Sequence, residues 1–144
     1  SGHAFAGVMV GRAVTEHPFS FSTVDADIYG DAHQNTISRA EVLFRYAKYA
    51  KTIEDQQGPR ARRSLVKPIF GLFTGEKNAK KFRSNLDTYL RRGNQPNSGD
   101  VMPVHDVLLR ASECLDSSVL EMTPLQWNLR EQDRLNHRNA RIAI

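Results

Sequence analysis

Glycine and arginine at the end of a short apolar run are the first residues that could do chemistry. The run Gly7-Val8-Met9-Val10 leads into Gly11 and Arg12, a pattern that predicts a buried strand followed by a tight turn. Free backbone amides in such a turn, together with a guanidinium, suit a phosphate group. A simple turn with a solvated arginine fits the same residues, and the pattern alone leaves both interpretations open.

A dense basic segment is the second candidate. Residues 60–92 contain ten basic and two acidic side chains, a net charge of +8, whereas residues 1–59 and 93–144 each contain five basic and seven acidic ones. Segregation of this kind predicts salt-sensitive attraction to a polyanion. A solvated helical face that binds nothing is the alternative. The expected RNA contacts are Arg60, Arg62, Arg63, Lys67, Lys80, Lys81 and Arg83.

The sequence gives little support for a metal site, a disulfide or a known catalytic arrangement. The five histidines lie in different predicted elements without metal-ligand spacing, so no metal site is expected. The single cysteine, Cys114, excludes an internal disulfide, favours a reducing compartment, and is interpreted as a packing residue beside Leu115. No serine–histidine–aspartate or paired-carboxylate arrangement can be supported from spacing. The chain therefore does not look like a complete enzyme.

The elements that must position these residues are mostly helices. Apolar residues at helical spacing predict helices from Pro18 to Gly30 and from a capping box at Ser38–Glu41 to Gly58. The same spacing predicts a helix from Leu65 to Gly75, with a kink or a helix start at Pro68. Two more helices are predicted over 77–91 and 101–115. A polar loop is expected at 93–99. Thr123 and Pro124 open a last, peripheral helix. The predicted fold class is all-α, a bundle of five or six helices preceded by one short strand.

The lone strand has its own implication. A buried strand cannot satisfy its backbone hydrogen bonds alone, so its partner strands are expected in a part of the protein outside this chain. An unpaired apolar edge would also favour self-association. No stretch is apolar and long enough to predict a membrane span.

Two segments resemble the tRNA-dihydrouridine synthases. Residues 7–13, followed by Pro18 and by Val-Asp-Ala-Asp-Ile-Tyr-Gly at 24–30, are similar to the end of the family's flavin-binding (β/α)8 barrel. Residues 65–75, Leu-Val-Lys-Pro-Ile-Phe-Gly-Leu-Phe-Thr-Gly, followed by 79–83 and Leu86, are similar to its C-terminal helical domain, where a basic residue precedes a Gly-Leu-Phe-x-Gly helix end. The resemblance covers about residues 7–115 and is closest to the bacterial A-type branch.

The resemblance implies a two-domain flavoenzyme, in which an FMN-binding barrel is followed by a helical domain that binds tRNA. Flavin reduced by NADPH delivers hydride to a D-loop uridine, which becomes 5,6-dihydrouridine. Gly11 and Arg12 would then contact the FMN phosphate. The expected organisation is a barrel-strand remnant at 1–16, a helical tRNA-binding domain at 17–115 and a C-terminal tail with a peripheral helix at 116–144.

The sequence also departs from the family. The Asn-x-Gly-Cys-Pro type segment that carries the family's general acid is not in this chain, and Cys114 matches nothing in it. Pro68 stands where the family commonly has a histidine, so no role is borrowed from that histidine. We therefore expect no catalytic residue, no tight binding of FMN or NADPH, and no turnover by this chain alone.

The predicted function is thus that of the tRNA-binding helical domain of a flavin-dependent oxidoreductase, in the cytoplasm or an organelle. Two other interpretations stay open. The chain could be a helical protein-interaction module with a solvated basic face, or part of a different flavin barrel enzyme. Salt-dependent tRNA binding separates the first from the second, and a tRNA requirement for activity separates the first from the third.

Overall fold

The computed structural model describes residues 9–31, 36–92 and 101–142, and the regular elements in these ranges are all helical. The α-helices are α1 (Arg12–Glu16), α2 (Val24–Tyr29), α3 (Arg39–Gln57), α4 (Arg62–Val66), α5 (Ala79–Arg92), α6 (Val104–Ser112), α7 (Ser117–Leu120) and α8 (Pro124–Ile142). The 3-10 turns η1 (Pro18–Phe21), η3 (Pro59–Ala61) and η4 (Lys67–Ile69) join them. The all-α expectation is confirmed for these ranges.

The predicted strand is described only in part. Met9 and Val10 adopt no regular structure and are 95% and 44% exposed, and residues 7 and 8 lie outside the described residues. The strand and its barrel origin therefore stay predictions. The loop predicted at 93–99 also lies outside the described residues.

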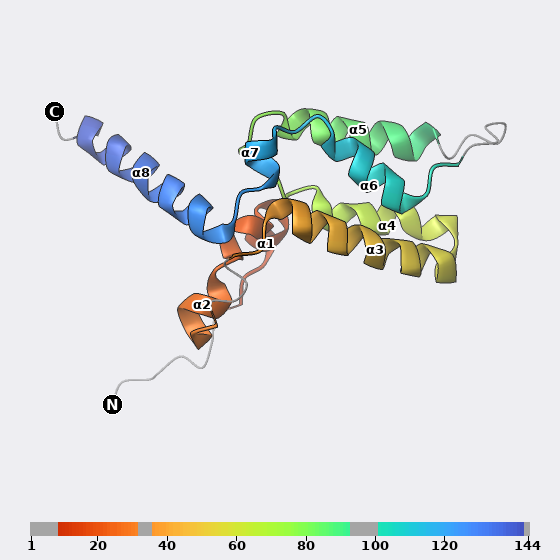
Figure 1. Ribbon diagram of the computed structural model, residues 1–144, viewed down its shortest axis with the longest axis horizontal. Coiled ribbons are helices and arrows are strands. Elements are labelled where there is room, and N and C mark those ends of the chain that lie inside the picture. Colours follow the sequence, from red (N-terminus) through yellow and green to blue (C-terminus); the bar gives the residue numbers. More distant parts are fainter. Residues whose placement is uncertain (1–8, 32–35, 93–100, 143–144) are drawn as a thin grey trace.

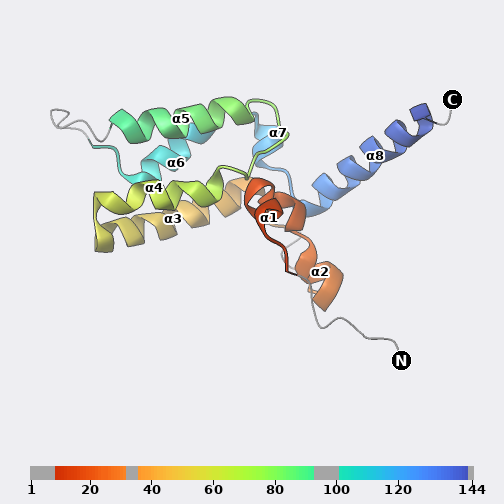
Figure 2. The same ribbon diagram turned by 180° about the vertical axis from the view of Figure 1, so that it is seen from behind.

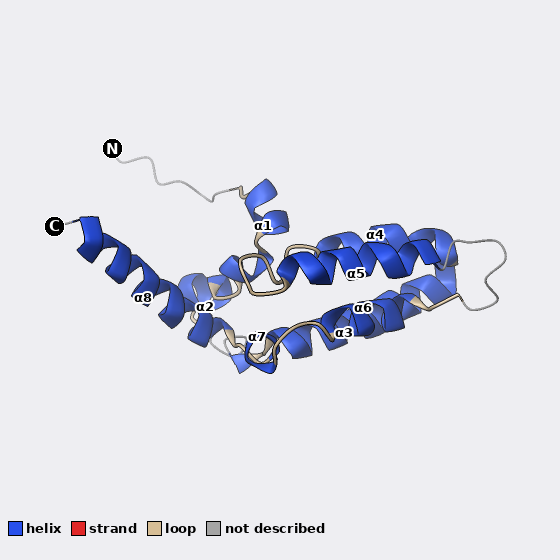
Figure 3. Ribbon diagram, turned by 90° about the horizontal axis from the view of Figure 1, so that it is seen from above, coloured by secondary structure: helices blue, strands red, loops and turns tan. Residues whose placement is uncertain are grey.

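Four antiparallel segments form the body of the molecule (Figure 1). The chain runs out along α3, returns through α4 and η4, runs out again along α5 and returns along α6. Viewed from above, α4 and α5 form one layer and α3 and α6 the other (Figure 3). The basic segment therefore occupies one layer of a four-helix arrangement.

Helix α3 begins and ends where the sequence predicts. The Ser38 hydroxyl accepts a hydrogen bond of 3.2 Å from the Glu41 amide, as in a capping box. The Glu41 carboxylate, however, accepts from Arg45 at 2.6 Å. Gly58 ends the helix at a φ of 77°, a left-handed conformation that favours glycine.

Two predicted helices are broken into shorter pieces. The predicted run from Leu65 to Gly75 leaves α-helical geometry at Val66, and Pro68 opens the 3-10 turn η4 because proline lacks the amide that would continue the helix. The change from α-helical to 3-10 geometry thus falls next to Pro68, where a kink or a helix start was predicted, and residues 70–75 form turns. The predicted helix from Pro18 to Gly30 is likewise wrong as one element, since it divides into η1 and α2. The described residues thus contain eight α-helices instead of five or six.

The core lies between the two layers. It includes most apolar positions predicted for 38–58, 65–75, 77–91 and 101–115, whereas Ile28 of the helix predicted at 18–30 is 66% exposed. Phe73 and Phe82 meet in this core with ring centroids 4.9 Å apart in a T-shaped arrangement. Burial of each such side chain contributes roughly 1.5–3 kcal/mol. Phe19, Phe73 and Phe82 are buried, so their rings serve packing and are not available to stack on bases.

Helix α8 extends away from the bundle in both side views (Figures 1 and 2). Thr123 and Gln126 cap it reciprocally, with amide-to-side-chain distances of 3.0 and 3.4 Å. Leu129 and Leu135 are each 56% exposed, so the helix is peripheral, as predicted. Among the described residues no helix combines the length and apolarity needed to cross a membrane.

Candidate nucleic-acid interface

The exposed cations of the basic segment lie along the α4–α5 layer. Arg60, Arg63 and Lys67 are exposed on the segment from η3 to η4. Lys80 and Lys81 are exposed on the first turn of α5, and Arg83 is half-buried beside them. Six of the seven sequence-predicted contacts therefore reach solvent on neighbouring elements.

Two hollows carry these cations. The first, of about 380 Å³, lies between the start of the α4 segment and the end of α5, and Arg60, Arg63, Arg91 and Asp87 line it. The second, of about 470 Å³, lies at the start of α5, and Lys80, Lys81 and Arg83 are among the residues that line it. Hollows lined by guanidinium and ammonium groups suit phosphate oxygens, because these cations donate charge-assisted hydrogen bonds.

Arg62 also lines the first hollow, but its guanidinium is paired inside the bundle. Its side chain is 11% exposed, and its Nε donates a short hydrogen bond to Glu54 Oε1, a carboxylate that is 9% exposed. Adjacent helical positions project in directions about 100° apart, so Arg63 reaches solvent whereas Arg62 points into the bundle. We therefore remove Arg62 from the expected RNA contacts.

The buried Glu54 joins three elements. It lies near the end of α3 and pairs with Arg62 on α4, while its Oε2 accepts the Val104 amide of α6 at 2.8 Å. That amide is an orphan donor of the first turn of α6, where negative charge is also favoured by the helix dipole. Glu54 thus holds one end of the bundle together.

Gly11 and Arg12 lie at the exposed start of α1. A Cβ added at Gly11 would meet nothing within 4 Å, so packing within this chain does not require glycine there. The phosphate contact expected of these two residues stays a prediction.

The C-terminal end of α1 is fixed to the helical body by Gly71. A Cβ at Gly71 would lie 2.4 Å from the Thr15 carbonyl oxygen, 2.8 Å from that of Glu16 and 2.8 Å from Pro18 Cδ. The Thr74 hydroxyl donates to the Glu16 carbonyl at 2.9 Å. The glycine at the centre of the 65–75 motif therefore permits the close approach of the segment that carries Gly11 and Arg12.

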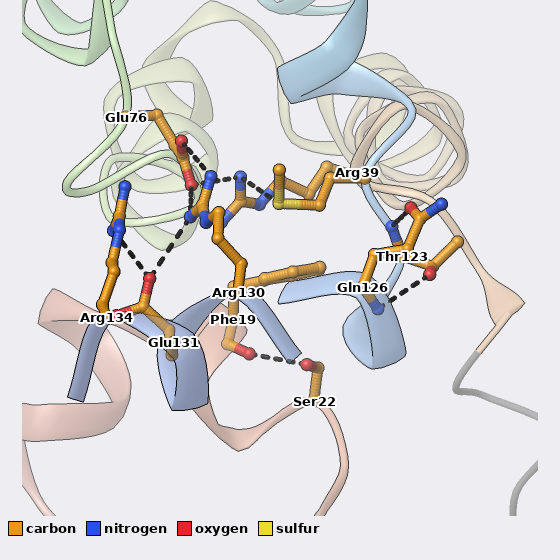
Figure 4. A network of polar contacts seen from close by, with 10 residues as sticks. Phe19, Ser22, Arg39, Glu76, Thr123, Gln126, Arg130, Glu131 and Arg134 are labelled. Atoms are coloured by element: carbon orange, nitrogen blue, oxygen red, sulfur yellow. Dashed lines mark hydrogen bonds and ion pairs between the residues drawn. The ribbon is translucent and has the colours of Figure 1, made fainter. Parts of the chain in front are cut away.

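A cluster of three charged residues links the bundle to α8 (Figure 4). Glu76, in the turn before α5, accepts from Arg39 at 2.8 Å and from Arg130 at 2.9 and 2.5 Å. The Arg39 guanidinium is stacked 4.1 Å from the centre of the Phe19 ring. Only 1% of the Arg39 side chain and 5% of the Glu76 side chain are exposed.

The pKa values of this cluster follow its geometry. Burial would raise the pKa of Glu76, but hydrogen bonds from Arg130 and Arg39 outweigh that effect and lower it. Burial lowers the pKa of Arg39, whereas the hydrogen bond with Glu76 raises that of Arg130. All three groups are therefore charged at neutral pH. Sequence reasoning missed the cluster, since its members are 37 and 54 residues apart and follow no motif.

Cys114 is half-buried, and its thiol donates to the Ala111 carbonyl at 3.3 Å, which fits the packing role expected for it. Among the described residues, no three or more histidine, cysteine, aspartate or glutamate side chains gather as metal ligands would.

Comparisons with known proteins bear on these observations. No family model and no solved structure matches the chain. A tRNA-dihydrouridine(20/20a) synthase from Synechocystis is 38% identical over 81 residues, which are 55% of this chain and 23% of that protein. One from Pseudomonas putida is 29% identical over 92 residues, which are 64% of this chain and 26% of that protein. The chain thus spans about a quarter of the length of these relatives. This similarity confirms the resemblance drawn from the sequence motifs: more than half of the chain is similar to part of two tRNA-dihydrouridine synthases.

Proposed function

We propose that this chain is the helical part of an FMN-dependent tRNA-dihydrouridine synthase, with residues 17–115 as the tRNA-binding domain. The parent enzyme would use NADPH to reduce a D-loop uridine to 5,6-dihydrouridine. The chemistry would take place in a barrel, of which residues 1–16 represent the end. The chain by itself would then be inactive.

One observation carries the proposal furthest. In a chain similar to tRNA-modifying enzymes, the surplus positive charge is confined to 33 residues, and those residues form one layer of the bundle. The exposed cations that line the two hollows along this layer can contact successive phosphates of a folded RNA. Such contacts fix the position of the RNA without reading its sequence, so specificity for one uridine would come from docking geometry and base flipping.

The position of α1 supports the same arrangement. The Gly71 contact fixes the segment carrying Gly11 and Arg12 against the helical body. A barrel that continues from residues 1–16 would therefore have a defined orientation relative to the basic layer. When bound, FMN would supply the hydride transfer, and Gly11 and Arg12 would hold its phosphate.

The test is tRNA binding by the full 144-residue chain, measured by fluorescence anisotropy at several salt concentrations. We expect salt-sensitive binding, with a slope of log affinity against log salt that falls by about one for each phosphate contact removed. The variant Lys67→Gln, Lys80→Gln, Lys81→Gln should weaken binding and flatten the slope by about two to three.

A charge-matched control lies on the other layer. The variant Arg45→Gln, Lys48→Gln, Lys51→Gln removes three exposed cations from α3, on which we place no RNA contact. Its affinity and slope should stay close to those of the unmodified chain. Equal losses in both variants would show that net charge alone governs binding and would contradict the proposed interface.

A protein-interaction module is the second candidate function. A hollow of about 510 Å³ between η1 and α3 is lined largely by apolar groups, among them Phe21, Val42, Tyr46 and Leu72. Such a hollow suits an apolar side chain of a protein partner. If the chain binds no tRNA at low salt, this candidate gains over the first.

A further inference from the structure

Helix α8 carries a row of four arginines outside the part of the chain that resembles the family. Arg130, Arg134, Arg138 and Arg141 follow one another at intervals of four, four and three residues. At about 100° per residue, these spacings place them within an arc of about 80° on one face of the helix. The distal three, from Arg134 to Arg141, extend over about 10 Å of the helix axis.

This face is open to solvent and hollowed. A depression of about 640 Å³ runs along it, lined by the four arginines together with Asp133, His137 and Ile142. Arg138 and Arg141 are exposed, and the Arg134 side chain is 56% exposed while it pairs with Glu131 at 2.7 Å. Asp133 is the carboxylate in the lining, but Arg130 also pairs with Glu76 and Glu131, and Arg134 pairs with Glu131. The surplus positive charge of the depression therefore lies toward Arg138 and Arg141.

The base of α8 is anchored, so the row has a defined direction. Arg130 is held by both oxygens of Glu76 (Figure 4), Asn128 donates to the Thr23 hydroxyl at 3.2 Å, and Trp127 meets Phe19 edge-on at 6.0 Å. Beyond these contacts the helix projects from the bundle (Figure 1). The arginine row thus begins at a fixed point and continues away from the body.

The anchor joins two basic surfaces. Glu76 also lines the hollow at the start of α5 that contains Lys80, Lys81 and Arg83. Its negative charge is compensated by Arg39 and Arg130 together. No uncompensated carboxylate therefore separates the cations of α5 from the arginine row of α8 at this junction.

We propose that the arginine face of α8 is a second phosphate-binding surface, which extends the α5 surface outward along the backbone of a bound RNA. The inference rests on the proposed function and adds a region to it. Planar guanidinium groups bind phosphate oxygens bidentately, and a row of them complements the charge of an RNA backbone. The exposed Leu125 and Leu129 lie on the opposite side of the helix, so RNA bound to the arginine face would leave them uncovered, and Leu135 lies on the flank of that face, about 60° from Arg138.

The experiment compares two triple variants of the full chain, with a tRNA transcript as the probe. The α8 variant is Arg134→Gln, Arg138→Gln, Arg141→Gln, and the control is Arg45→Gln, Lys48→Gln, Lys51→Gln on α3. We expect the α8 variant to raise the Kd for tRNA by about tenfold or more at low salt and to lower the salt slope by about two to three. The control should change neither, and the melting temperatures of both should stay close to that of the unmodified chain because the replaced side chains are exposed.

A charge-restoring variant tests the face itself. Adding Gln132→Arg, Asn136→Arg and Asn139→Arg to the α8 variant returns the net charge but places it on the leucine side. We expect tRNA affinity to stay low. Full recovery would show that net charge suffices and would overturn the inference.

The other possible outcomes distinguish failure of this inference from failure of the proposed function. If the α8 variant binds tRNA as the unmodified chain does, while the Lys67, Lys80, Lys81 variant is impaired, the inference fails and the proposed function stands. If the unmodified chain binds no tRNA, both fail. The inference is also overturned if the α8 variant binds tRNA normally and the chain forms dimers that are lost in the variant Leu129→Gln, Leu135→Gln. In that case α8 is a contact surface for a second copy of the chain.

Discussion

Two adjacent arginines with the same charge should behave in opposite ways when they are replaced. Arg62 is buried against Glu54, whereas Arg63 is exposed on the basic layer. Arg62→Met should destabilise the fold and leave the salt dependence of tRNA binding unchanged. Arg63→Gln should leave stability unchanged and lower the salt slope by about one. Their adjacency makes each the natural control for the other.

The magnitude follows from the contacts of Glu54. Removal of one partner of a buried ion pair costs about 3–5 kcal/mol, because the remaining charge stays buried without compensation. Here the Val104 amide still donates to Glu54 at 2.8 Å, and the start of α6 favours negative charge, so we expect the lower end, about 3 kcal/mol. At about 2.1 cal/mol/K per residue of unfolding entropy, this corresponds to a fall of about 10 °C in Tm. Arg63→Gln, at an exposed site, should change stability by less than about 0.5 kcal/mol.

The assay combines thermal unfolding by circular dichroism with tRNA anisotropy, performed well below the Tm of the weaker variant. The double variant Glu54→Met, Arg62→Met should regain part of the lost stability, because no charge is then left buried, although the Val104 amide loses its acceptor. If Arg62→Met melts within about 3 °C of the unmodified chain, the energetic role of the pair is refuted. If it flattens the salt slope as Arg63→Gln does, Arg62 reaches the RNA and our correction is wrong.

Three further predictions concern the contacts that position the candidate surfaces. Gly71→Ala should lower stability by about 1–3 kcal/mol, and hydrogen exchange should quicken at residues 13–17, because the new Cβ collides with backbone atoms of α1 that cannot rotate away. Because its pKa is lowered in the folded state, Glu76 contributes stability at neutral pH that is lost as the pH falls below about 4.3, the ordinary value for glutamate. Fluorescence of Trp127, the single tryptophan, should report loosening of α8 in that range, and Glu76→Gln should abolish this acid transition while loosening α8 at neutral pH. Ser38→Ala should cost about 1 kcal/mol through loss of the α3 cap, measured by chemical denaturation.

The sequence alone determined the local features of this protein. Ser38, Gly58 and Pro68 mark real boundaries because capping, left-handed backbone and the missing proline amide act within a few residues. The apolar residues Leu65, Ile69, Leu72 and Phe73 are buried as predicted, although the last two lie in turns instead of on a helix. The concentration of positive charge and the family resemblance were also readable, since both depend on residue type and order alone.

The tertiary structure decided which charges are available. Arg62 and Arg63 are equivalent in a count of charge, but only packing against Glu54, eight residues away, shows that one of them is internal. In the sequence Glu76 is an acidic residue within a basic segment. In the structure it binds Arg39, which precedes it in the chain, and Arg130, which follows it. The close approach at Gly71 and the direction of α8 likewise depend on residues distant in the chain. Burial, ion pairing and the orientation of a helix are properties of contacts between such residues, and local patterns do not encode them.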